Sequence, residues 1–283
     1  NFETPERFSK QVSTKFHEAS AVFTKDGNIM YFTRNNFNNG KKRRSDDKII
    51  LLKLYKAERE NGKWTNITEL PFNNDNYSVS HPALSPDEKT LYFASDMPGT
   101  FGASDIFKVS INTDGSYGTP VNLGNKINTE GRETFPFISA ENELYFASDG
   151  HPGLGGLDVF ELDLNKNTEA KNVGAPVNSE KDDFAFTYNA NKKVGFFSSN
   201  RTGVDNIYKA DPVCNVQALV RVKDAKTGNV LEGATVMLVD EKQKMVSNQT
   251  SASNGETITG VMCNTVYSAQ VSKSGYESGV FEV

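Results

Sequence analysis

The sequence has 283 residues, of which 36% are hydrophobic and 24% charged, with a net charge of −5. This composition supports a globular core and argues against nucleic acid as a partner, because no concentrated basic face is implied. No stretch reaches the roughly 18 apolar residues of a membrane-spanning helix. Residues 1–10 are polar and unlike a signal peptide, so we expect either a mature N-terminus here or a missing upstream segment.

One short pattern recurs through the first 210 residues. Each copy is an apolar strand with two adjacent aromatic or large apolar residues followed by a small polar turn, as in Ile29–Arg34, Leu91–Asp96, Leu144–Asp149 and Val194–Asn200. The period is about fifty residues. We expect Tyr31, Tyr92, Tyr145 and Phe196 to occupy equivalent places in second strands, with Phe32, Phe93, Phe146 and Phe197 on the opposite face.

Each copy also carries signals for further strands. Turn chemistry at Asp26–Gly27 and Ser85–Glu88 predicts a strand before each aromatic phrase. Third strands follow at Asp105–Phe107, Asp158–Phe160 and Asn206–Tyr208, and outer strands at Gly118–Leu123 and Lys171–Val177. Four short strands per copy, with no helical periodicity, predict the blades of an all-β propeller over residues 1–211.

Ring closure leaves two alternatives. Arg7–Val12 resembles the outer-strand segment that precedes later copies. Either it completes the fourth blade of a four-bladed ring, or an upstream segment supplies the rest of a fifth blade.

A different pattern begins at residue 212. Alternating runs at Gln217–Asp224, Gly233–Val239 and Val266–Val271, separated by glycine-centred turns, predict a small β-sandwich over residues 212–283.

Residues 17–210 resemble the TolB-type propeller repeats of OmpA-like outer-membrane proteins of the Bacteroidetes, through the Ser-Pro-Asp-Glu turn, Leu-Tyr-Phe-Ala-Ser-Asp and Gly-Gly-Leu-Asp-Val-Phe. Val216–Val239 resembles the carboxypeptidase regulatory-like module that follows those repeats. The order of modules is similar to that of PorE-like, lipid-anchored components of the type IX secretion machinery.

The resemblance implies a periplasmic, outer-membrane-associated protein whose partners are envelope proteins of a secretion or motility assembly. It also implies that a helical repeat region and another blade precede these modules and that an OmpA-like domain follows them. Peptidoglycan binding would reside in that following domain and in no residue here. In an oxidising periplasm we expect a disulfide between Cys214 and Cys263, which lie in one small module.

Candidate catalytic and metal-binding residues are few. His17–Ala21 begins like a zinc-protease helix, but Ala21 stands where the second histidine is required. His17, His81 and His151 share no repeat position and have no ligand at metal-binding spacing, and no nucleophile elbow or phosphate-binding loop occurs. We therefore predict no catalytic residue, no metal and no cofactor, although calcium sites in the Asp-rich loops stay open.

The aspartates leave a second alternative. Propeller enzymes can place an acid and a base at the central channel, and seven aspartates could do so: Asp87, Asp96, Asp105, Asp149, Asp158, Asp182 and Asp183. Most fall in repeated turn positions, which favours caps on backbone N–H groups.

The basic run Lys41–Arg44, within the insertion Asn35–Asp47, is typical of a solvated loop, with a docking finger for an acidic partner as the alternative. We expect a non-catalytic scaffold; the alternatives are a carbohydrate-active or peptide-processing enzyme and a propeller that binds a glycan or peptide.

Overall fold

The structure is a computed structural model that describes residues 4, 6–38, 40–166, 168–212, 215–262 and 265–282. Within these ranges every regular element is a β-strand, and no helix is long and apolar enough to cross a membrane. The chain divides into two compact units, residues 1–211 and 212–283, which are described separately.

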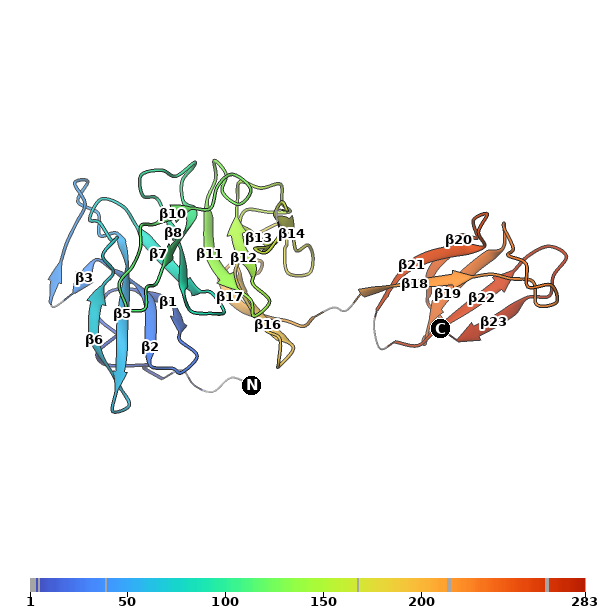
Figure 1. Cartoon of the computed structure of the whole chain (residues 1–283), viewed down its shortest axis with the longest axis horizontal. Helices are drawn as coiled ribbons and strands as arrows, with labels where there is room; N and C mark the ends of the chain where they lie inside the picture. Colours follow the sequence, from blue (N-terminus) through green and yellow to red (C-terminus); the bar gives the residue numbers. More distant parts are fainter. Residues whose placement is uncertain are drawn as a thin grey trace. The chain divides into compact units, whose positions relative to one another are not determined.

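Four antiparallel sheets follow one another along the first unit (Figure 1). The first contains β1 (Glu18–Phe23), β2 (Ile29–Asn35), β5 (Leu52–Glu60) and β6 (Lys63–Glu69). The second contains β7 (Val79–Leu84), β8 (Thr90–Ser95), β9 (Asp105–Ser110) and β10 (Val121–Asn122). The third contains β11 (Glu133–Ile138), β12 (Glu143–Ser148), β13 (Asp158–Asp163) and β14 (Lys171–Asn172). The fourth has three strands in the described ranges, β15 (Asp183–Asn189), β16 (Val194–Ser199) and β17 (Asn206–Ala210).

The predicted second strands are confirmed, and their aromatic residues share one register. Their partners in the third strands are Lys56, Lys108, Glu161 and Lys209 for Tyr31, Tyr92, Tyr145 and Phe196. The next residue in each second strand stacks on a third-strand ring, in the pairs Phe32–Tyr55, Phe93–Phe107, Phe146–Phe160 and Phe197–Tyr208. The four-stranded sheets and their common register are consistent with propeller blades.

Apolar side chains hold the sheets against one another. One buried cluster joins Tyr31 and Leu54 of the first sheet to Leu91 and Phe93 of the second. Another joins the second sheet to the third, and β15 contacts the third sheet in turn. Since full burial of one large apolar side chain contributes roughly 1.5–3 kcal/mol, these clusters dominate the stability of the unit.

Three of the four stacked ring pairs are covered by a polar side chain. The guanidinium of Arg34 lies 4.9 Å from the Phe32 ring centroid and donates to the carbonyl oxygen of Val12. Arg201 covers the Phe197–Tyr208 pair and donates to the carbonyl of Val177. His151 covers Phe146 and Phe160, with Nε2 2.8 Å from the carbonyl of Ile127, and Met97 belongs to the cluster around Phe93 and Phe107.

The structure corrects the interpretation of Arg7–Val12 as an outer strand, because no strand forms there. Instead, Ser13 N–H donates to the carbonyl of Ser9, just as Asn128 donates to Gly124 and Asn178 to Gly174. The N-terminal segment thus corresponds to the linker that follows an outer strand, and its Val12 packs on the first sheet.

The insertion Asn35–Asp47 is more ordered than a solvated loop. It contains the hairpin β3 (Phe37–Asn38) and β4 (Lys41–Lys42), and Arg43 forms ion pairs with Glu69 and Asp75. Lys41 and Lys42 remain exposed.

The second unit contains two sheets that face each other. β18 (Asn215–Arg221) pairs with β21 (Glu256–Met262). The other sheet has the order β20 (Met245–Thr250), β19 (Thr235–Asp240), β22 (Tyr267–Ser272) and β23 (Gly279–Glu282). Leu238, Val261, Tyr267 and Ala269 form a core shared by both sheets.

The predicted disulfide partners, Cys214 and Cys263, lie outside the described residues. The described residues next to them in the sequence, Asn215 and Met262, are paired at the end of the β18–β21 ladder.

Candidate functional site

The first strand of each sheet in the first unit is interrupted by a bulge at the same place. The pairing register shifts in β1, β7, β11 and β15. At each shift one residue has a left-handed backbone, with φ of 36° at Ser20, 54° at His81, 50° at Phe135 and 53° at Ala185. Such backbones cost of order 1–3 kcal/mol for residues other than glycine and concentrate at functional sites.

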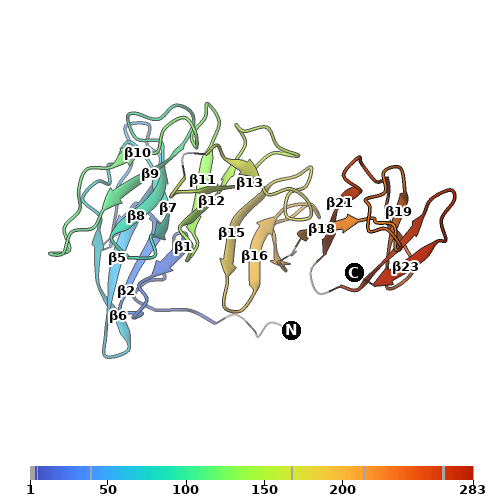
Figure 2. The same cartoon turned by 45° about the vertical axis from the view of Figure 1, so that its right-hand side comes forward.

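These four bulged strands surround a cavity of about 430 Å³. The lining residues come from β1, β7, β11 and β15, which are labelled in Figure 2. The lining residues are Ser20–Phe23, His81–Leu84, Phe135–Ile138 and Ala185–Thr187. Among these described residues none is charged, so the wall is apolar and aromatic with a few neutral polar groups.

His81 is the main polar group of the cavity. Its Nδ1 lies 2.8 Å from the Ser20 hydroxyl, and its backbone N–H donates to Thr33 Oγ1. The imidazole lies against Phe135, with ring centroids 3.8 Å apart, and Phe135 in turn contacts Phe184. All four sheets of the first unit thus contribute to one small set of contacts.

Burial lowers the pKa of His81 from 6.5 to about 4, because the charged imidazolium loses its hydration. The ring is therefore neutral at pH 7, when it can donate one hydrogen bond and accept another. A general base works best with a pKa near the operating pH, so this imidazole is a weak base.

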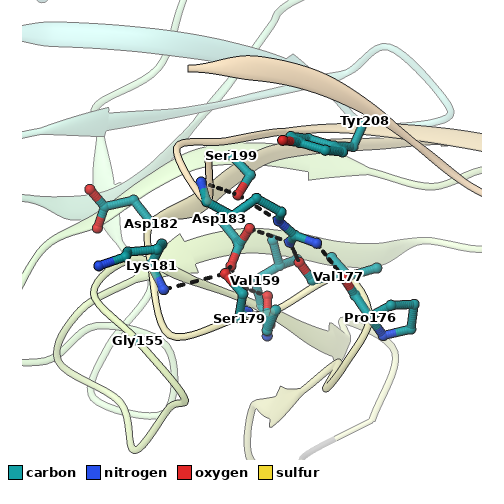
Figure 3. A network of polar contacts seen from close by, with 12 residues as sticks. Gly155, Val159, Pro176, Val177, Ser179, Lys181, Asp182, Asp183, Ser199 and Tyr208 are labelled. Atoms are coloured by element: carbon teal, nitrogen blue, oxygen red, sulfur yellow. Dashed lines mark hydrogen bonds and ion pairs between the residues drawn. The ribbon is translucent and has the colours of Figure 1, made fainter. Parts of the chain in front are cut away.

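The predicted carboxylates lie elsewhere, in turns and loops or, for Asp105, Asp158 and Asp183, at the first residue of a strand. Figure 3 shows the best-connected example, in which Asp183 accepts hydrogen bonds from Ser179 N–H and the Ser179 hydroxyl. Arg201 pairs with the same carboxylate at 2.6 Å and also donates to Ser199 Oγ. Asp182 accepts from the N–H of Leu157. These contacts stabilise the linker.

The two aspartates at the start of the third strands are buried. Asp105 accepts from Phe101 N–H and from Asn122, and Asp158 accepts from the N–H groups of Leu154 and Gly155. The Oδ1 atom of each has no hydrogen-bond partner within the described part of the chain. Both carboxylates therefore act chiefly as caps for the preceding loop.

The remaining aspartates occupy turns. Asp87 accepts from the Ser85 hydroxyl and Lys89 N–H, Asp96 from Ser78 N–H, and Asp149 pairs with Arg132. None of the seven predicted aspartates lines the cavity. In the described ranges no group of three or more His, Cys, Asp or Glu could hold a metal ion.

Ser20, Phe135 and Ala185 were missed as site residues by the sequence interpretation, and His81 was considered only as a metal ligand. Their common signal is a position ten or eleven residues before the repeated Tyr31, Tyr92, Tyr145 and Phe196. Aligning each copy that far upstream identifies the four positions, but it does not predict their backbone conformation.

No protein-family model matches the sequence, and no curated protein matches it either. Solved structures show distant similarity to TolB-like β-propellers. A putative TolB from Agrobacterium tumefaciens is 14% identical with a TM-score of 0.48, covering 92% of this chain and 79% of that one. TolB from Acinetobacter baumannii is 15% identical with a TM-score of 0.46, covering 90% and 56%. An α-L-arabinofuranosidase from Lactobacillus brevis is 13% identical with a TM-score of 0.45, covering 74% and 73%.

Proposed function

We propose that the chain is a non-catalytic interaction module of a periplasmic, outer-membrane-associated assembly concerned with secretion or motility. One observation carries the non-catalytic part of this proposal. The cavity shared by four blades has no charged lining residue, whereas the repeated aspartates cap loops elsewhere. Assignment to the envelope, and to the type IX secretion machinery among its assemblies, rests on the sequence resemblance.

The proposal includes a finer description of the fold. Residues 1–211 form a β-propeller of four or five blades, and residues 212–283 form a carboxypeptidase regulatory-like sandwich. The exposure of one equivalent position in the third strands supports a ring of sheets that continues beyond the fourth sheet. Leu54, Ile106 and Val159 are 0% exposed there, but Ile207 of the fourth sheet is 70% exposed. An exposed residue at a core position indicates a surface that another sheet or a partner covers.

Site-specific photo-crosslinking in native envelopes tests this surface. The crosslinking residue replaces Ile207 in one variant and Val121, an exposed apolar residue of β10, in a matched control. We expect a discrete adduct from Ile207 and none from Val121. An adduct to another protein supports a partner surface, and one within the same chain supports closure by a further sheet. No adduct at Ile207 would contradict both.

A second candidate function is a binding site for a glycan or peptide in the cavity. The observation that favours it is the left-handed backbone conformation that Ser20, His81, Phe135 and Ala185 share. Such strained conformations need support from the surrounding structure and concentrate at functional sites. The same site gives the enzyme alternative its best residues, because Ser20 and His81 are hydrogen-bonded.

Turnover assays on esters, peptides and glycosides separate these functions. We expect no turnover by the chain, and no change in Ser20→Ala or His81→Gln. Hydrolysis that both substitutions abolish, with Ser13→Ala as an unaffected control outside the cavity, would establish an enzyme and overturn the non-catalytic proposal.

A further inference from the structure

The two sheets of the second unit differ in width. Four strands, β20, β19, β22 and β23, face only β18 and β21. Between β18 and the β22–β23 part of the wider sheet lies a groove of about 860 Å³. The narrower sheet therefore leaves part of the inner surface of the wider one uncovered.

The groove has an apolar floor. Val220 and Val222 line one side, and Ala269 and Val271 line the other. Phe281 of β23 also lines the groove and is 60% exposed, although it belongs to an element of the sandwich. An additional strand beside β18 would remove this apolar surface from water.

The backbone of β18 can receive such a strand. The N–H of Val222 donates to Gly255 on the β21 side. Because successive residues of a strand point their N–H groups to opposite edges, those of Gln217, Leu219 and Arg221 point away from β21. No described strand pairs with that edge of β18.

Just beyond the strand the chain turns back on the β21 side. Lys223 forms a bridge with Val230, and Leu231 N–H donates to the carbonyl of Val222, close to Gly255. This turn therefore leaves the edge of Gln217–Arg221 that faces away from β21 uncovered.

Charge at the rim selects the occupant. Lys223 and Lys226 line the groove and are exposed, and Lys273 also lines it and donates to the carbonyl of Glu232. Arg221 is paired with Glu256. The lining carboxylates are Asp224, which accepts hydrogen bonds from the backbone of its own turn, and Glu277. Because the lysines outnumber the carboxylates, the rim favours a segment with acidic residues near its end.

We propose that this groove binds an extended segment of a partner protein, which pairs with β18 and places alternate apolar side chains against Val271 and Phe281. The recognition is strand addition, in which backbone hydrogen bonds provide affinity and alternate side chains provide specificity. It involves only the second unit, so it stands or falls independently of the proposed function of the first.

The test uses the full chain and a synthetic seven-residue peptide in which valine alternates with threonine and an aspartate stands at each end. A peptide of the same composition with its valines adjacent is the control. Amide hydrogen exchange is followed by NMR. We expect the alternating peptide to slow exchange at Gln217, Leu219 and Arg221 at least about tenfold, and the control peptide to leave it unchanged.

Two proline variants form a matched pair. Leu219→Pro removes an outward N–H from the free edge of β18. Ile258→Pro removes one from the opposite edge of the same sheet, since Leu219 and Ile258 are paired and similarly exposed, at 52% and 50%. We expect Leu219→Pro to weaken binding at least about tenfold and Ile258→Pro to leave it unchanged.

Peptides with N-methylated backbone amides give the same answer without altering the protein fold. Methylation at alternate residues on the pairing edge should abolish binding, and methylation at the intervening residues should not. Three results would overturn the proposal. The first is no binding of the alternating peptide at about 1 mM, a limit for weak association. The second is slow exchange of the β18 edge amides in the dilute chain without peptide, which indicates that its own chain covers them, and the third is protection of these amides that appears only as protein concentration rises, which indicates a second copy.

Discussion

Single residues of this protein matter most where packing removes a polar group from water. His81 is the clearest case, because its imidazole contacts an aromatic ring and a hydroxyl in an uncharged cavity. The position lies in a bulge, so its environment depends on four strands from four sheets.

The stability of the first unit should therefore fall at mildly acidic pH. The pKa of His81 is about 4 in the folded chain and about 6.5 in the unfolded one, so the unfolded state binds the proton first. Stability is fully present above pH 6.5 and is lost as the pH falls toward 4. Between pH 7.5 and 5 this one group should cost about 2 kcal/mol.

Urea unfolding at both pH values, compared between the natural chain and His81→Gln, measures this effect. The variant should lack about 2 kcal/mol of the pH dependence. His17→Gln, at an exposed histidine, serves as the control and should behave like the natural chain. Equal pH dependence in all three proteins would show that His81 is hydrated.

Asp158 and Asp87 should differ sharply in their contribution to stability, although both accept backbone hydrogen bonds. Asp158 is completely buried, so Asp158→Ala leaves the N–H groups of Leu154 and Gly155 without an acceptor. We expect a loss of about 2–4 kcal/mol. Asp87→Ala, in an exposed turn, should cost less than about 1 kcal/mol. Comparable losses in equilibrium unfolding would contradict the burial of Asp158.

At the scale of elements, the four sheets of the first unit share one pairing register but differ in how far a neighbouring sheet buries them. Ile106 and Ile207 occupy the same position in β9 and β17, and only Ile106 is covered by a neighbouring sheet. This contrast makes the fourth sheet the weakest part of the first unit.

Ile106→Ala should destabilise the isolated chain by about 2–5 kcal/mol, because it opens a cavity between two sheets. Ile207→Ala should change it by less than about 1 kcal/mol, since its side chain is already exposed. Chemical denaturation measures both. A large loss from Ile207→Ala in the isolated chain would mean that a segment of the chain covers β17.

The strands could be predicted from the sequence because aromatic pairs and turn residues recur at a fixed period. The bulges could not, because Ser20, His81, Phe135 and Ala185 share no side-chain chemistry; they share only a backbone conformation set by the surrounding sheets. Arg7–Val12 was misinterpreted for a related reason. Its apolar pattern fits a strand, but the Ser9–Ser13 hydrogen bond makes it a turn.

At the scale of the whole molecule, the two compact units should unfold in separate transitions. Cys214 and Cys263 belong to the second unit, and their described neighbours Asn215 and Met262 are paired. If the predicted disulfide forms, reduction should lower the second unit's transition temperature alone, by an amount corresponding to about 2–4 kcal/mol.

Differential scanning calorimetry with and without reductant measures this shift, and thiol labelling of the unreduced chain counts free cysteines. The double variant Cys214→Ser and Cys263→Ser should reproduce the reduced protein and ignore reductant. Two reactive thiols in the unreduced protein would refute the disulfide.

The caps over the stacked ring pairs have a consequence for the history of the repeat. Arg34, His151 and Arg201 cover equivalent rings, and Met97 belongs to the cluster around the remaining pair, yet Arg34 lies within β2 and Arg201 in the loop beyond β16. Arg34, His151 and Arg201 also contact the equivalent carbonyl of the linker, at Val12, Ile127 and Val177. Duplicated copies can therefore exchange one covering group for another, and even recruit it from a different position, while the backbone stays unchanged. Divergence of this kind erases likeness between sequences faster than likeness between shapes.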